Sequence, residues 1–106
     1  MPIRQLNHVR NHLAVLLDEA LPAVTTSTQI FANAPTGTRE IWLTLRTAGL
    51  TFTFDGGAAT AGANGHDFAA DPSTPYVFDD MDYTRALLVR AIQNGGTASG
   101  WISYRG

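Results

Sequence analysis

The stretch REIWLTLR, residues 39–46, decides the fold class of this chain. Ile41, Leu43 and Leu45 occupy every second position, and charged, hydroxyl or indole side chains fill the positions between them. A period of two residues is typical of a β-strand that buries one face and shows the other to solvent or to a partner. The alternation therefore predicts a strand that packs one side on a core.

More extended segments follow on both sides of this stretch. The run LTFTF at 50–54 has apolar side chains at alternate positions and comes directly after the turn-forming residues 47–49. We therefore expect the strands 39–46 and 50–54 to pair as neighbours. A long Ala/Gly-rich surface loop is expected over 58–73, with a short strand inside it. Alternation, β-branched residues or short apolar runs predict further extended segments at 24–32, 66–69, 76–78, 84–92 and 97–105.

The end of the chain reads AIQNGGTASGWISYRG, residues 91–106. Its turn, Asn94-Gly95-Gly96, is rich in residues that tolerate a positive φ, and this predicts a β-hairpin that joins 84–92 to 97–105. Short strands at this spacing are typical of an antiparallel β-sandwich or a partly open barrel. We assign residues 23–106 to that mainly β domain.

The first 22 residues follow a different pattern. Apolar residues from Ile3 to Ala20 recur at spacings of three and four, which predicts an amphipathic helix or arm over 1–22. Pro22 is a natural stop for it. Arginines early and acids late in the segment oppose the helix dipole, so packing must stabilise this element. It lies either on its own sheet or on a neighbouring subunit.

Composition narrows the class of partner. The chain has 106 residues, a charged fraction of 15% and a formal net charge of −2. It lacks the basic footprint of a nucleic-acid binder, so we expect no direct nucleic-acid partner. The apolar runs are too interrupted for a membrane span. A surface of small neutral residues indicates either that copies or partners cover it, or that it suits a secreted or environmental protein.

Metal-binding patterns are present only in part. His8 and His12 are four residues apart, as in some zinc sites, but no Glu follows the first His and no third ligand is apparent. The acidic turn 79–82 lacks the glycine and the final Glu of a calcium loop. We expect neither a metal nor another cofactor.

The sequence pattern of a catalytic site is likewise incomplete. Asp55, His66 and Ser73 are the residue types of a hydrolytic triad, but no nucleophile elbow surrounds Ser73. We therefore expect no catalytic residues, and a protein that is not an enzyme.

The tryptophans are the more informative candidates. Trp42 and Trp101 alternate with polar residues on the strand faces opposite the apolar stripes. Trp beside Arg is typical of a protein interface hot spot and equally of a platform that stacks a sugar ring, although either Trp can also simply cover the edge of the core. The candidate interface residues are Leu6, Val9, Leu13, Leu16, Trp42, Arg46, Trp101 and Arg105.

The order of segments from Arg39 onward resembles a known group of proteins. An RxIxLxL strand, an FxFD strand, an Ala/Gly-rich loop with Asn-Gly and the closing run ALLVRAIQNGGTASGWI resemble small β-sandwich virion proteins of tailed bacteriophages. Those are head decoration, cement, neck or tail proteins, and the segment 1–22 departs from their pattern. The resemblance implies a structural protein located in the virion, a homo-oligomer whose other partners include the major capsid protein. The alternative is a carbohydrate- or receptor-binding module that uses exposed Trp residues.

Overall fold

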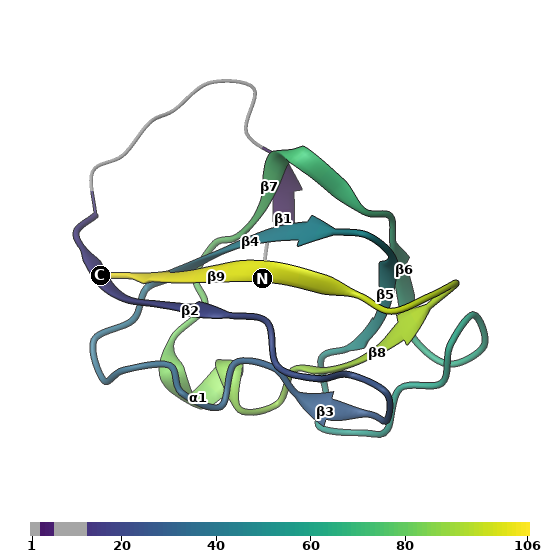
Figure 1. The fold of residues 1–106 in the computed structure, drawn as a ribbon. Coiled ribbons are helices and arrows are strands. Elements are labelled where there is room, and N and C mark those ends of the chain that lie inside the picture. The colour runs from purple at the N-terminus through teal and green to yellow at the C-terminus, as the bar shows by residue number, and fades with distance from the viewer. Residues whose placement is uncertain (1–2, 6–12) are drawn as a thin grey trace.

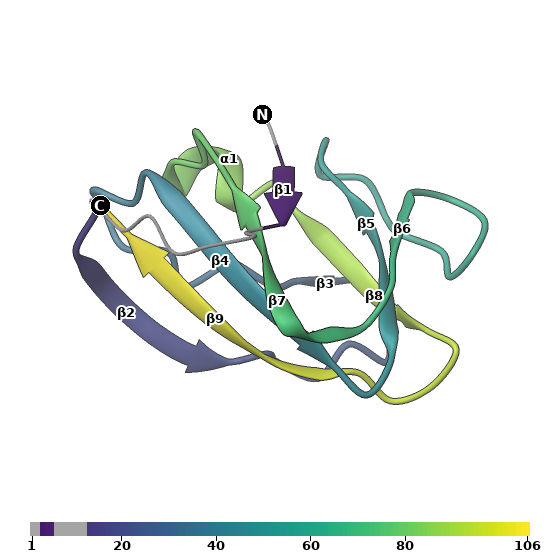
Figure 2. The same cartoon turned by 90° about the horizontal axis from the view of Figure 1, so that it is seen from above.

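Two antiparallel sheets packed face to face make up the fold, which confirms the predicted β-sandwich. A computed structural model describes residues 3–5 and 13–106 (Figure 1). The five-stranded sheet has the order β1 (Ile3–Gln5), β7 (Asp71–Phe78), β4 (Glu40–Arg46), β9 (Ser99–Arg105) and β2 (Val15–Ala20). The four-stranded sheet has the order β3 (Thr28–Gln29), β8 (Arg90–Asn94), β5 (Gly49–Thr53) and β6 (His66–Phe68). Seen from above, β2, β9, β4 and β7 lie side by side (Figure 2).

Strand β4 follows the predicted alternation. Ile41, Leu43 and Leu45 are fully buried and face the space between the sheets. Their neighbours on β9 include Ile102 and Tyr104, which the strand register places on the same face and which are also fully buried. The apolar stripe of REIWLTLR therefore forms the part of the core that the five-stranded sheet contributes at β4.

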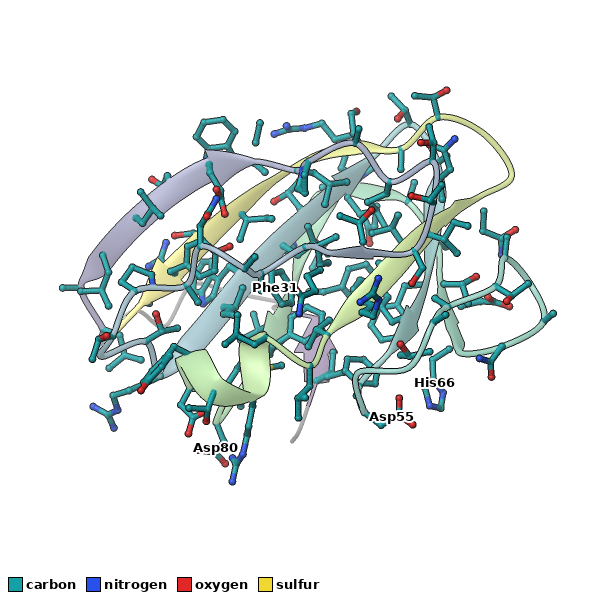
Figure 3. All side chains as sticks on the ribbon, turned by 90° about the horizontal axis from the view of Figure 1, so that it is seen from below. Phe31, Asp55, His66 and Asp80 are labelled. Carbon is teal, nitrogen blue, oxygen red and sulfur yellow. The ribbon has the colours of Figure 1, made fainter. Side chains whose placement is uncertain are left out.

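Aromatic rings fill much of the space between the sheets. Phe31 makes edge-to-face contacts with Phe78 and Tyr104, at ring-centre distances of 5.2 and 6.3 Å. Figure 3 shows Phe31 in the middle of the molecule. Aromatic pairs in such geometry add stabilisation beyond the area that they bury.

Strands β4 and β5 do not pair, and that part of the prediction is wrong. The connection at 47–48 carries the chain from the five-stranded to the four-stranded sheet, where β5 pairs with β6 and β8. The expected C-terminal hairpin is wrong for the same reason, because β8 and β9 belong to different sheets. Both short turns therefore cross between the layers.

The two crossings lie against each other. Thr47, which has a positive φ of 65°, donates a hydrogen bond from its hydroxyl to the carbonyl oxygen of Thr97 at 2.7 Å. The same hydroxyl lies 3.1 Å from the hydroxyl of Ser99. This contact between residues 50 positions apart ties the two turns together.

The N-terminal helix is also wrong over the described part of 1–22. Residues 3–5 form β1 at one edge of the five-stranded sheet, and β2 forms the other edge by pairing with β9. Leu6 and Val9 lie outside the described residues. The strand register shifts between Val15 and Leu17, so the apolar residues of this segment do not follow a regular strand alternation. Hydrogen bonds to the edge of β9 stabilise an extended segment that has weak helix signals of its own.

Two shorter predictions need correction. The segment 84–92 is not one strand, because α1 (Tyr83–Ala86) and a turn precede β8. Asp82 caps this helical turn by accepting a hydrogen bond from the Arg85 N–H, so a local cap overrides the apolar alternation. Of the predicted strand 24–32, only β3 is extended. The strands predicted near 66–69 and 76–78 are confirmed as β6 and as the end of β7.

Candidate functional site

The outer face of the five-stranded sheet brings together the four candidate residues of β4 and β9. Trp42 and Arg46 point away from the core on β4, and Trp101 and Arg105 do so on β9. The register pairs β4 with β9 over their whole length, so these side chains share one surface. We call this surface, with Glu40, Thr44, Ser99 and Ser103, the outer face.

The two tryptophans of the outer face differ in exposure. Trp101 is 45% exposed, whereas Trp42 is half-buried. The guanidinium carbon of Arg105 lies 3.8 Å from the centre of the Trp42 ring, and the Trp42 indole N–H donates to Glu40 Oε1. One face of the Trp42 ring is therefore already occupied, and Trp101 is the tryptophan available to a partner.

The outer face also holds buried polar atoms without partners. The Nε and Nη1 atoms of Arg105 and the hydroxyl of Ser103 are buried and make no hydrogen bond. Ser103 was not expected to belong to the site. The signal for it was present in the sequence, since a serine between Trp101 and Arg105 falls on their face of the strand.

The second part of the site is the free edge of β2. Val15, Leu16 and Leu17 are consecutive and are 47%, 41% and 37% exposed. Leu16 was a candidate from the sequence, whereas Val15 and Leu17 were not. Leu13, just before the strand, is half-buried.

Strand β2 is fixed to the core through Glu19. Tyr104 donates its hydroxyl hydrogen to Glu19 Oε2 at 2.5 Å, and Asn33 Nδ2 donates to Glu19 Oε1 at 2.8 Å. Burial, and then the hydrogen bond to Glu19 and its negative charge, raise the pKa of Tyr104 well above its usual range. The free edge is thus held in place by a buried side chain of the neighbouring strand.

The described residues that were considered for metal chemistry form no cluster of ligands. Among residues 3–5 and 13–106, no group of three or more His, Cys, Asp or Glu side chains is placed to hold a metal ion. Asp55 accepts a hydrogen bond from the Gly57 N–H. Figure 3 shows Asp55 and His66 close together in this view, with Asp80 apart from them near α1. His8 and His12 lie outside the described residues.

The Asp82 carboxylate is committed to capping α1. The N–H of Arg85 and the hydroxyl of Thr84 both donate to it, and these two hydrogen bonds hold the pKa of Asp82 below its usual value. Such a carboxylate serves the local fold.

No protein-family model, curated protein or solved structure matches the chain. In the part of the chain that the structure describes, no helix is both long enough and apolar enough to cross a membrane.

Proposed function

We propose that this chain is a structural protein of a tailed-phage virion, a decoration, cement or other head-associated subunit that stabilises the particle through protein–protein contacts. The virion setting rests on the resemblance of the sequence from Arg39 onward. The contact role is supported by one observation above all: β2 is an edge strand that exposes three consecutive apolar side chains. Long exposed apolar edges favour pairing with another chain.

The backbone of β2 is suited to such pairing. The Leu21 N–H donates to the carbonyl oxygen of Gly100 on β9 at 3.0 Å. Because backbone groups alternate in direction along a strand, Asp18 and Ala20 point their N–H and C=O groups to the free edge. A strand from a neighbouring subunit can therefore extend the five-stranded sheet.

The rigidity of the edge supports the same role. Glu19 joins β2 both to Tyr104 and to Asn33, so little ordering of the strand is needed on binding. Preorganisation of this kind increases affinity because less entropy is lost on association. On the outer face, Trp101 and Arg46 add a second contact area of the composition found in interface hot spots.

Light scattering on the purified chain, from micromolar to millimolar concentration, tests the contact role. We expect concentration-dependent self-association that Leu16→Asp weakens. Leu88→Asp is the matched control, because Leu88 is a leucine of similar exposure, 45%, that lies outside β2. A wild-type chain that stays monomeric throughout, or equal effects of both variants, would contradict self-association through β2.

A proline substitution distinguishes backbone pairing at the edge of β2 from non-specific hydrophobic association. Ala20→Pro removes an N–H that points away from β9, so we expect the fold to persist and association to fall. Association that is unchanged in a folded Ala20→Pro variant would exclude sheet extension at this position.

A carbohydrate- or receptor-binding module remains the second candidate, and the exposure of Trp101 favours it. Trp101 is paired with Thr44 across the strands of the outer face. A glycan array with the wild type and Trp101→Ala distinguishes the two functions. A sugar binder retains affinity as an isolated domain and loses it with Trp101, whereas a structural subunit shows no glycan signal.

A further inference from the structure

A pocket beside β1 and β6 is lined mainly by rings. Ile3 of β1 contributes from the five-stranded sheet, Phe54 directly follows β5, and His66 and Phe68 belong to β6. Its volume is about 410 Å³. We propose that this pocket binds a planar aromatic ring that carries a hydrogen-bonding group.

The pocket wall is the outer end of the aromatic cluster of the core. The Phe54 ring is parallel to that of Phe52, with an interplanar angle of 1° and centres 5.9 Å apart. Phe68 lies 4.8 Å from Phe52. Phe52 is fully buried, whereas Phe54 and Phe68 are half-buried. A ring that enters the pocket continues this packing, and aromatic contacts favour it over an aliphatic group of equal size.

His66 supplies the polar group of the site. Its imidazole is exposed and lies 5.9 Å from the centre of the Phe54 ring, tilted by 35°. A neutral imidazole has one nitrogen that donates and one that accepts, so it pairs with either a donor or an acceptor on the ligand. An apolar pocket with one polar group that orients the ligand is the usual composition of a small-molecule site.

The pocket volume sets the size of the ligand. A cavity of about 150 Å³ holds one benzene ring. The pocket here is larger and open to solvent on one side, so it has room for a bicyclic ring such as indole. Strands β1 and β2 form opposite edges of the five-stranded sheet, so a ligand at Ile3 leaves the free edge of β2 uncovered. The proposal is therefore independent of the assembly role.

Titration of the full chain with indole, followed by NMR, tests the pocket. We expect saturable shifts of the resonances of Ile3, Phe54, His66 and Phe68, and much smaller shifts with cyclohexanol, which carries a hydroxyl on a non-aromatic ring. Absence of saturable indole shifts, or equal binding of cyclohexanol, would overturn the proposal.

A second probe identifies the source of the ring. N-acetyl-tryptophanamide presents indole as a protein side chain does. Binding of both probes supports a site that accepts an aromatic side chain of a partner, and binding of indole alone supports a site for a free small molecule.

Substitutions assign the contacts. Phe54→Leu keeps the apolar bulk and removes the ring, and it should weaken indole binding roughly two- to tenfold. Tyr83→Leu is the control, because it removes a 42% exposed ring from α1. If Phe54→Leu does not fold, His66→Ala serves instead, and it should weaken the binding of indole more than that of toluene. A folded variant at either position that binds indole as tightly as the wild type would overturn the assignment.

Discussion

Tyr104 and Glu19 form a hydrogen bond of 2.5 Å between neighbouring strands, one inside the five-stranded sheet and one at its edge. Tyr104 is fully buried and Glu19 is half-buried. The Tyr104 hydroxyl must therefore stay protonated to donate the hydrogen bond that holds β2 at the edge of the sheet.

Alkaline pH should destabilise the protein through this pair. Burial and Glu19 raise the pKa of Tyr104 in the folded state above the value of about 10 expected in the unfolded chain. The stabilisation is thus complete below about pH 10 and decreases as the pH rises beyond it. Urea unfolding between pH 8 and roughly 11.5 should show a fall in the free energy of unfolding that is smaller in Tyr104→Phe.

Tyr76 is a second tyrosine that contributes to the alkaline dependence, and it serves as the control. Burial, and then the charge of Asp71, also raise its pKa, so the Tyr104→Phe variant should keep a residual alkaline dependence that Tyr76→Phe removes. An alkaline dependence that is the same in the wild type and in Tyr104→Phe would contradict the role of the Tyr104 pair.

Two glycines with positive φ should respond differently to alanine. Gly37 has φ +98° and open space around it, whereas a Cβ on Gly65, which has φ +131°, would lie 2.3 Å from the carbonyl oxygen of Phe52. Backbone strain alone should cost Gly37→Ala about 1–3 kcal/mol. Gly65→Ala should cost clearly more, as measured by urea unfolding. Equal losses would mean that β6 moves away from β5 without penalty.

Two buried hydroxyls should have opposite importance. The Thr51 hydroxyl donates to Asp67 Oδ1 and accepts from the Gly62 N–H, while the Ser103 hydroxyl has no partner. Thr51→Val removes both hydrogen bonds, although Asp67 Oδ1 still accepts one from Asn94, and should cost about 1–3 kcal/mol. Ser103→Ala should change the free energy of unfolding little, because it removes a buried polar atom that gains nothing on folding. A large loss in Ser103→Ala would show that this hydroxyl has a partner in solution.

Tryptophan fluorescence should separate the two indoles. Trp101 is 45% exposed, whereas Trp42 is half-buried beneath Arg105. Trp101→Phe should shift the emission to shorter wavelength and reduce quenching by acrylamide. Arg105→Gln should change the emission of the remaining Trp42. Strong quenching in Trp101→Phe would contradict the shielding of Trp42.

Much of the candidate site was predictable from alternation. Trp42, Arg46, Trp101 and Arg105 were recognised because a period of two places every second residue on one face. The stacking of Arg105 on Trp42 was not predictable, because it depends on the register between strands more than 50 residues apart. At the exposed edge 15–17, Leu16 was predicted as an interface residue but on a helix, because the register of β2 shifts between Val15 and Leu17 and the sequence there lacks a strand alternation.

The sequence by itself determined that β4, β5 and β9 are extended and which side of each faces the core, because side-chain alternation is local. Only the tertiary structure decided which strands pair. The turns at 47–48 and 95–98 look like hairpin turns, yet both carry the chain from one sheet to the other. The physical reason is that the backbone N–H and C=O groups of a strand point to both of its sides. Each side needs a partner strand, and those partners lie far away in the sequence. For the same reason the segments 3–5 and 15–20 are strands: they pair with backbone groups on the edges of β7 and β9 that would otherwise have no partner.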